Sequence, residues 1–134
     1  MKKGMITSAV AAATLAALAA LPIQAAHADT MTCSIAPLAQ GCDTGKLTAF
    51  NNVIWTEVRN CYVTGIGSSV SWKLIDSGNG NTVASGTVPW GKQFQKTTTG
   101  LYSKYYLRLY NGNPGARGRM LNTNPSWGGG WSNC

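Results

Sequence analysis

The chain after residue 28 is divided into short runs of β-branched and aromatic residues by closely spaced glycines and asparagines, and this pattern points to a β fold. Residues 70–75 alternate apolar and polar side chains, as a half-buried strand does. The turn signal at 77–81 and the run at 82–88 complete a predicted β-hairpin. This part of the sequence contains no amphipathic helical stretch of useful length.

Further strands are predicted on both sides of this hairpin. Residues 53–66 and 101–110 are rich in β-branched and aromatic residues, and 90–96 and 117–121 are shorter candidates. About five to seven short strands joined by such turns predict a small antiparallel β-sandwich or barrel. No repeat or linker divides residues 29–134, so we expect a single domain.

Residues 1–28 have the features of a cleaved secretory signal. Lys2 and Lys3 precede an alanine-rich apolar run over 5–21, and Ala26-His27-Ala28 matches the small-x-small pattern of a signal-peptidase site. A retained membrane anchor is the alternative, but alanine is weakly apolar and no second apolar run follows. We therefore expect a secreted domain of residues 29–134 without a transmembrane span.

Loss of this leader would restrict the chemistry of the mature domain. His27 is the only histidine, and removal of Lys2 and Lys3 lowers the net charge from +7 to +5. Without histidine or a free thiol, Ser-His-Asp and Cys-His arrangements are unavailable. Among the four acids, Glu57 lies two residues before Arg59, so the two share a strand face and are expected to pair. We expect no enzyme activity, no metal and no cofactor.

Four cysteines in an exported chain predict two disulfides. They allow three pairings, of which we favour a local Cys33–Cys42 clip and a long Cys61–Cys134 closure that holds the glycine-rich C-terminus. A zinc site is disfavoured, because the sequence has no Cys-x-x-Cys pair and the mature chain has no histidine.

The first candidate binding surface lies on the strand predicted near residues 104–110. Alternation places Tyr105, Leu107 and Leu109 on the core face. The opposite face then carries Lys104, Tyr106, Arg108 and Tyr110. Arginine offers a planar fork for anions and tyrosine a flat ring with a polar tip, so this face suits sugars, phosphates or a partner protein. An ordinary solvent-facing strand is the alternative.

A second candidate is the segment that begins at Trp90. If residues 90–96 are extended, Trp90, Lys92, Phe94 and Lys96 lie on one side. Alternatively, the two aromatic residues enter the core and the lysines lie on a loop.

The glycine-rich tail is a third candidate. Trp127 and Trp131 flank three glycines and suit insertion at a membrane interface, a sugar clamp, or packing back onto the core. Arg117 and Arg119 follow a turn and are a weaker candidate for an anion site. Their pattern is more typical of a solvated loop.

The signal, the positive charge and the cationic-aromatic residues together predict a secreted antibacterial protein of bacteriocin type, drawn to an anionic cell envelope. The short exported β domain with two disulfides is similar in plan to small bacterial secreted inhibitors and bacteriocins, although it lacks the Trp-Arg-Tyr triplet of tendamistat-type amylase inhibitors.

Two other functions stay open. One is a secreted inhibitor of an extracellular hydrolase, with 90–99 or 114–119 as the bait loop. The other is a carbohydrate-binding module that uses Trp127, Trp131 and Tyr106. The expected partner is an anionic envelope component or an extracellular protein. Nucleic acid is not expected, and the protein is expected to be a monomer.

Overall fold

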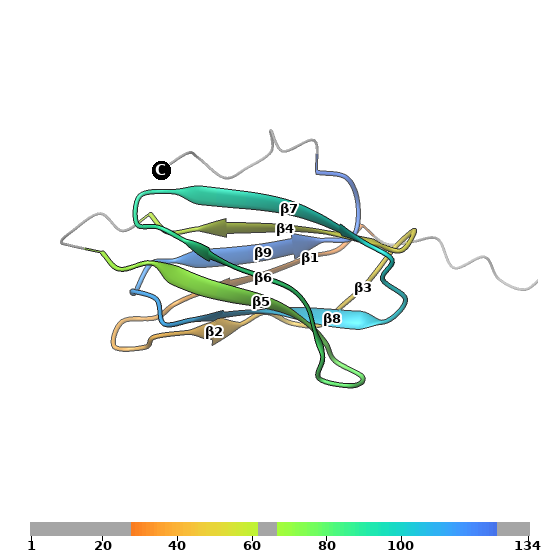
Figure 1. The fold of residues 1–134 in the computed structure, drawn as a ribbon, viewed down its shortest axis with the longest axis horizontal. Helices are drawn as coiled ribbons and strands as arrows, with labels where there is room; N and C mark the ends of the chain where they lie inside the picture. The colour runs from red at the N-terminus through yellow and green to blue at the C-terminus, as the bar shows by residue number, and fades with distance from the viewer. Residues whose placement is uncertain (1–27, 62–66, 126–134) are drawn as a thin grey trace, which may run out of the picture.

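The computed structural model describes residues 28–61 and 67–125, and this part of the chain is all-β (Figure 1). It contains nine strands: β1 (Thr30–Ser34), β2 (Cys42–Asp43), β3 (Leu47–Thr48), β4 (Val53–Arg59), β5 (Val70–Asp76), β6 (Thr82–Val88), β7 (Gln93–Thr99), β8 (Lys104–Tyr110) and β9 (Arg117–Leu121). These are more than the five to seven predicted, because β1 and the two-residue strands β2 and β3 lie in a segment without strand periodicity. No helix among these residues is long and apolar enough to span a membrane.

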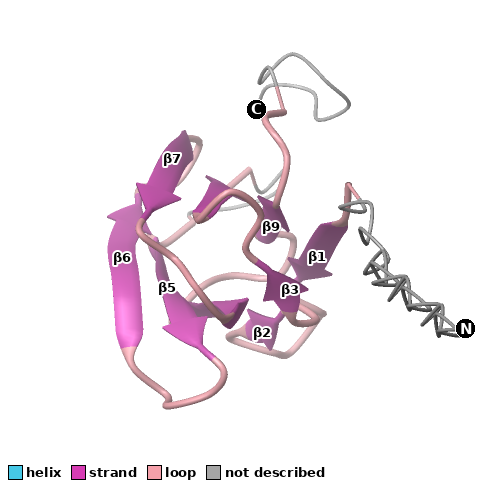
Figure 2. Ribbon diagram, turned by 90° about the vertical axis from the view of Figure 1, so that its right-hand side faces the viewer, coloured by secondary structure: helices cyan, strands magenta, loops and turns pink. Residues whose placement is uncertain are grey.

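The strands form two antiparallel sheets. Sheet A has the order β1-β9-β4-β7, and sheet B has the order β2-β8-β5-β6, with β3 also paired to β8. Figure 2 shows the two sheets facing each other. The fold is therefore a two-sheet, sandwich-like structure, which decides between the two architectures that the sequence allowed.

The core lies between the inner faces of the sheets. On β5, Val70, Trp72 and Leu74 are fully buried, so the alternation read from the sequence is confirmed. They join apolar side chains of β4, β8 and β9 in one cluster. Gly118 of β9 allows close packing of the sheets, because a Cβ at this position would lie 2.8 Å from Leu107 Cδ2.

The two sheets are joined by different contacts along the two long edges of the sandwich. On one side, the predicted Cys33–Cys42 disulfide joins β1 of sheet A to β2 of sheet B. Cys61 is also disulfide-bonded, but its predicted partner Cys134 lies outside the described residues. On the other side, β6 and β7 are the edge strands, and Phe94 contacts buried Trp72 with ring centroids 5.6 Å apart.

The prediction that residues 90–96 are extended is wrong for the first part of this segment. Residues 89–92 form a turn in which the Lys92 N–H donates to the Pro89 carbonyl at 3.2 Å, and Gly91 has a positive φ of 75°. β7 begins only at Gln93. The proline and the glycine together favour a turn over a strand, so Trp90 and Lys92 do not continue one face with Phe94 and Lys96.

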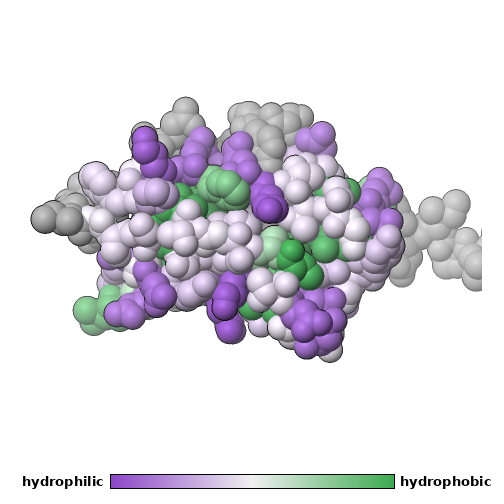
Figure 3. Space-filling view, in the orientation of Figure 1, coloured by the Kyte–Doolittle hydropathy of each residue, from purple (hydrophilic) through white to green (hydrophobic). Residues whose placement is uncertain are grey.

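Large hydrophobic side chains reach the surface in separate places. Figure 3 shows one such apolar group, which projects from the loop between β1 and β2. Among the described residues, the exposed ones of this kind are Leu38, Phe50, Val83, Trp90, Phe94 and Tyr102.

Candidate functional site

The outer face of sheet B gathers cations and tyrosines. On β8, Tyr105, Leu107 and Leu109 are buried. Lys104, Tyr106, Arg108 and Tyr110 therefore point away from the core and are exposed or half-buried, on the face that strand alternation assigned to them. We call these four residues, together with Lys46 and Lys73, the tyrosine–cation face.

The neighbouring strand β5 adds a cation that the sequence analysis did not select. Lys73 pairs with Arg108 in the β5–β8 register, and its Nζ lies 5.1 Å from the centre of the Tyr110 ring. The Arg108 guanidinium in turn lies 5.6 Å from the Tyr106 ring. Each cation–π contact contributes about 0.5–1 kcal/mol at an exposed site. The two contacts therefore help to hold both tyrosine rings in place on the surface.

Arg108 is engaged within the protein. Its Nε and Nη2 donate to Asp43 Oδ1 and Oδ2, both at 2.8 Å. The hydrogen bonds lower the pKa of Asp43 and raise the pKa of Arg108. Arg108 is therefore not the vacant anion fork that the sequence suggested. Because Asp43 lies 65 residues away in sequence, only the β2–β8 pairing reveals this contact.

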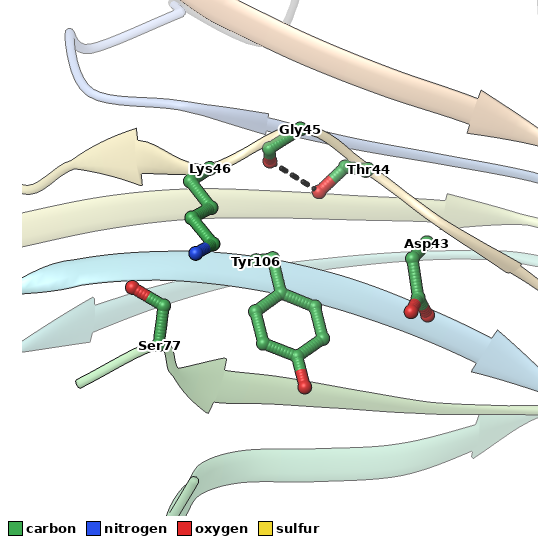
Figure 4. Close-up of a pocket in the computed structure, with 6 residues that line it drawn as sticks. All are labelled: Asp43, Thr44, Gly45, Lys46, Ser77 and Tyr106. Carbon is green, nitrogen blue, oxygen red and sulfur yellow. Dashed lines mark hydrogen bonds between the residues drawn. The ribbon is translucent and has the colours of Figure 1, made fainter. Parts of the chain in front are cut away.

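A hollow of about 520 Å³ opens beside Tyr106. It is lined by Asp43, Thr44, Gly45, Lys46, Ser77 and Tyr106. Figure 4 shows the Lys46 amine and the Ser77 hydroxyl on the same side of the Tyr106 ring. Thr44 shapes the wall, since its Oγ1 donates to the Gly45 carbonyl and accepts from the Leu107 N–H, both at 2.9 Å. Ammonium, hydroxyl and phenol groups thus line one concave surface, together with the Asp43 carboxylate that Arg108 pairs.

Three lysines give the tyrosine–cation face its available charge. Within the described part of the chain, Lys46, Lys73 and Lys104 take part in no ion pair. Their ammonium groups can therefore meet an external anion without first breaking an internal pair. Sequence reasoning missed Lys46 and Lys73, because neither stands on the strand that carries the tyrosines.

Trp90 and Lys92 do not join this face. The turn with Trp90 and Lys92 connects β6 to β7 at one end of the sandwich (Figure 1). Trp127 and Trp131 lie outside the described residues.

Arg119 belongs to a buried cluster on sheet A. Glu57, which has no exposed surface, accepts from Arg59 Nε at 3.1 Å and Nη2 at 2.9 Å. The same carboxylate accepts from Arg119 Nε at 2.5 Å and Gln95 Nε2 at 3.2 Å. The predicted Glu57–Arg59 pair is thus confirmed, and the arrangement holds sheet A together. The prediction that Arg119 lies on a solvated loop is therefore wrong.

Comparisons with protein-family models, curated proteins and solved structures found no match to this chain. The described residues contain no group of three or more side chains suited to hold a metal ion. The assignment of function therefore rests on the tyrosine–cation face itself.

Proposed function

We propose that this protein is an exported cationic antibacterial protein that binds an anionic polymer of the bacterial envelope through the tyrosine–cation face. The carrying observation is the set of three lysines without an ion pair beside two tyrosine rings held by cation–π contacts. The mature net charge of +5 would draw the protein toward an anionic surface.

The face suits a polymer that alternates phosphates with sugars or polyols. Lys46, Lys73 and Lys104 would meet phosphate oxygens, while Tyr106 and Tyr110 would pack against the carbon skeleton and hydrogen-bond its hydroxyl groups. Asp43 would keep Arg108 in a fixed orientation. Binding of this kind weakens with salt, because exposed charges are screened.

The test is binding to a soluble polyol-phosphate polymer, deacylated lipoteichoic acid, measured by calorimetry. The triple variant Lys46→Gln/Lys73→Gln/Lys104→Gln is expected to bind at least tenfold more weakly. The matched control Lys92→Gln/Lys96→Gln/Arg117→Gln removes the same charge elsewhere and should change affinity less than threefold. Equal losses in the two variants would show that net charge, and not this face, is responsible.

Growth inhibition tests the antibacterial part separately. The oxidised protein, residues 29–134, should inhibit strains in a panel of Gram-positive and Gram-negative bacteria, and the face variant should be less active than the control variant. Polymer binding without inhibition of any strain would retain the binding site and reject the antibacterial role.

A further inference from the structure

One end of the sandwich, on the left in Figure 1, is built from loops that hydrogen bonds tie together. Their described parts are residues 35–41, 60–61, 67–69, 89–92 and 111–116. We call this region the loop end.

A continuous set of hydrogen bonds links these loops. The Gly112 N–H donates to the Gln40 carbonyl at 2.9 Å, and Asn113 Nδ2 donates to the Ser68 carbonyl at 3.3 Å. Asn60 Nδ2 also donates to Ser68, at 2.7 Å, and the Asn60 backbone exchanges hydrogen bonds with residues 91 and 92. The loops therefore form one ordered surface.

Leu38 projects from this surface with a relative exposure of 104%. It follows Pro37 in a turn closed by the Ala39 N–H and the Ala36 carbonyl at 3.1 Å, and its φ is +67°. Glycine or asparagine usually occupies a turn position with positive φ. The backbone and the exposed apolar surface both disfavour leucine here, so the fold itself does not account for this residue.

Trp90 is the second projecting side chain, with a relative exposure of 46%. Its five-membered ring lies against Gly67, where a Cβ would come within 1.6 Å of Trp90 Cδ1. The glycine backbone thus supports one part of the indole. The Asn60 hydrogen bonds fix the turn beneath it, so the ring is presented to solvent in a set position.

The charge of the loop end fits a lipid surface. Its described loops contain no carboxylate, and Lys92 is the single charged residue among them. Leucine favours the acyl region, while indole and lysine favour the boundary with the head groups. Two side chains projecting from separate, tied loops suit a deformable bilayer better than a single pocket of fixed shape.

We propose that the loop end inserts Leu38 and Trp90 into the interfacial region of a lipid bilayer. This site is separate from the tyrosine–cation face, and the insertion depends on apolar contact rather than on charge. It would hold the protein at a membrane even where salt screens electrostatic attraction.

The experiment measures co-sedimentation of the full mature protein with phosphatidylcholine vesicles in about 1 M salt, where the Debye length is only about 3 Å. Wild type should sediment with the vesicles, and the double variant Leu38→Asn/Trp90→Ser should bind at least tenfold more weakly. Asparagine tolerates the left-handed backbone at position 38, so this change removes apolar surface without adding strain. Circular dichroism checks that each variant is folded.

Two control variants distinguish insertion at the loop end from nonspecific adsorption and from charge-driven binding. Tyr102→Ser removes an aromatic side chain that is 82% exposed in the segment between β7 and β8, and it should leave sedimentation unchanged. The tyrosine–cation triple variant should also sediment at high salt, so failure of one site is distinguishable from failure of the other. Absence of wild-type binding overturns the lipid proposal and favours a protein partner for the loop end. Equal loss with Tyr102→Ser also overturns it, because it indicates nonspecific adsorption through any exposed aromatic side chain.

Discussion

Leu38 has a backbone conformation that its side chain disfavours, and this has a measurable cost. The left-handed region costs a non-glycine residue about 1–2 kcal/mol, and a glycine at position 38 would remove this strain. Glycine also makes the unfolded chain more flexible, which offsets part of the gain in stability. Leu38→Gly should therefore raise the free energy of unfolding by about 0.5–1 kcal/mol. Urea denaturation measures the change, and a loss of stability would show that Leu38 has a packing role.

Among the residues that the structure describes, two carboxylates that accept arginine donors differ sharply in burial. Glu57 is fully buried between Arg59 and Arg119, whereas the side chains of Arg108 and Asp43 are 47% and 44% exposed. Removing one member of a buried pair typically costs about 3–5 kcal/mol, and an exposed pair contributes about 0.2–1 kcal/mol. Glu57→Gln should therefore destabilise the protein far more than Asp43→Asn in the same urea titration. Similar losses would contradict the assignment of Glu57 as a structural residue.

The Asp43–Arg108 pair also predicts how stability depends on pH. Because Arg108 lowers the folded-state pKa of Asp43, the stabilisation is complete above the unfolded pKa of about 3.9. It is lost as the pH falls through the lower, folded-state pKa. Unfolding measured between about pH 2 and 5 should thus show a steeper loss for wild type than for Asp43→Asn. The difference should stay below about 1 kcal/mol, because solvent screens the pair.

At the scale of single elements, sequence reasoning predicted most of the strands that have a clear period of two. The hairpin of β5 and β6 and the inward face of β8 follow from alternating side chains. β2 and β3 are two residues each, too short for a period to appear, and they exist because β8 offers them a pairing edge. The site was found in part for the same reason: alternation identified Tyr106 and Tyr110, but only strand pairing brought Lys73 and Asp43 beside them.

Gly118 shows how β9 meets the opposite sheet. A methyl group at this position would lie 2.8 Å from Leu107 Cδ2, and Leu107 is fully buried. Overpacking of this kind costs about 1–3 kcal/mol, so Gly118→Ala should lower the midpoint of thermal unfolding. Gly78→Ala is the matched control, because a Cβ there would meet no buried apolar side chain: its neighbours are Asp76 Oδ1 at 3.2 Å and the Ser103 hydroxyl at 3.6 Å. Equal shifts for the two variants would argue against tight packing at Gly118.

At the scale of the whole molecule, the two proposed binding regions lie on different parts of the sandwich. The tyrosine–cation face lies on the outer side of sheet B, and the loop end closes the sandwich at one end (Figure 1). Charge would govern the first contact and apolar insertion the second. A protein that uses both would approach an anionic envelope over a distance and then hold the membrane by short-range contact.

The unequal fastening of the two sides has a consequence for how the molecule opens. The Cys33–Cys42 disulfide joins the two sheets at β1 and β2, whereas a ring contact between Trp72 of β5 and Phe94 of β7 joins them near the other edge. Local opening releases the least protected elements first. In native-state hydrogen–deuterium exchange, amides of β6 and β7 should therefore exchange before those of β4 and β8. The sandwich would then open from the edge at β6 and β7 while the Cys33–Cys42 bond keeps β1 and β2 joined.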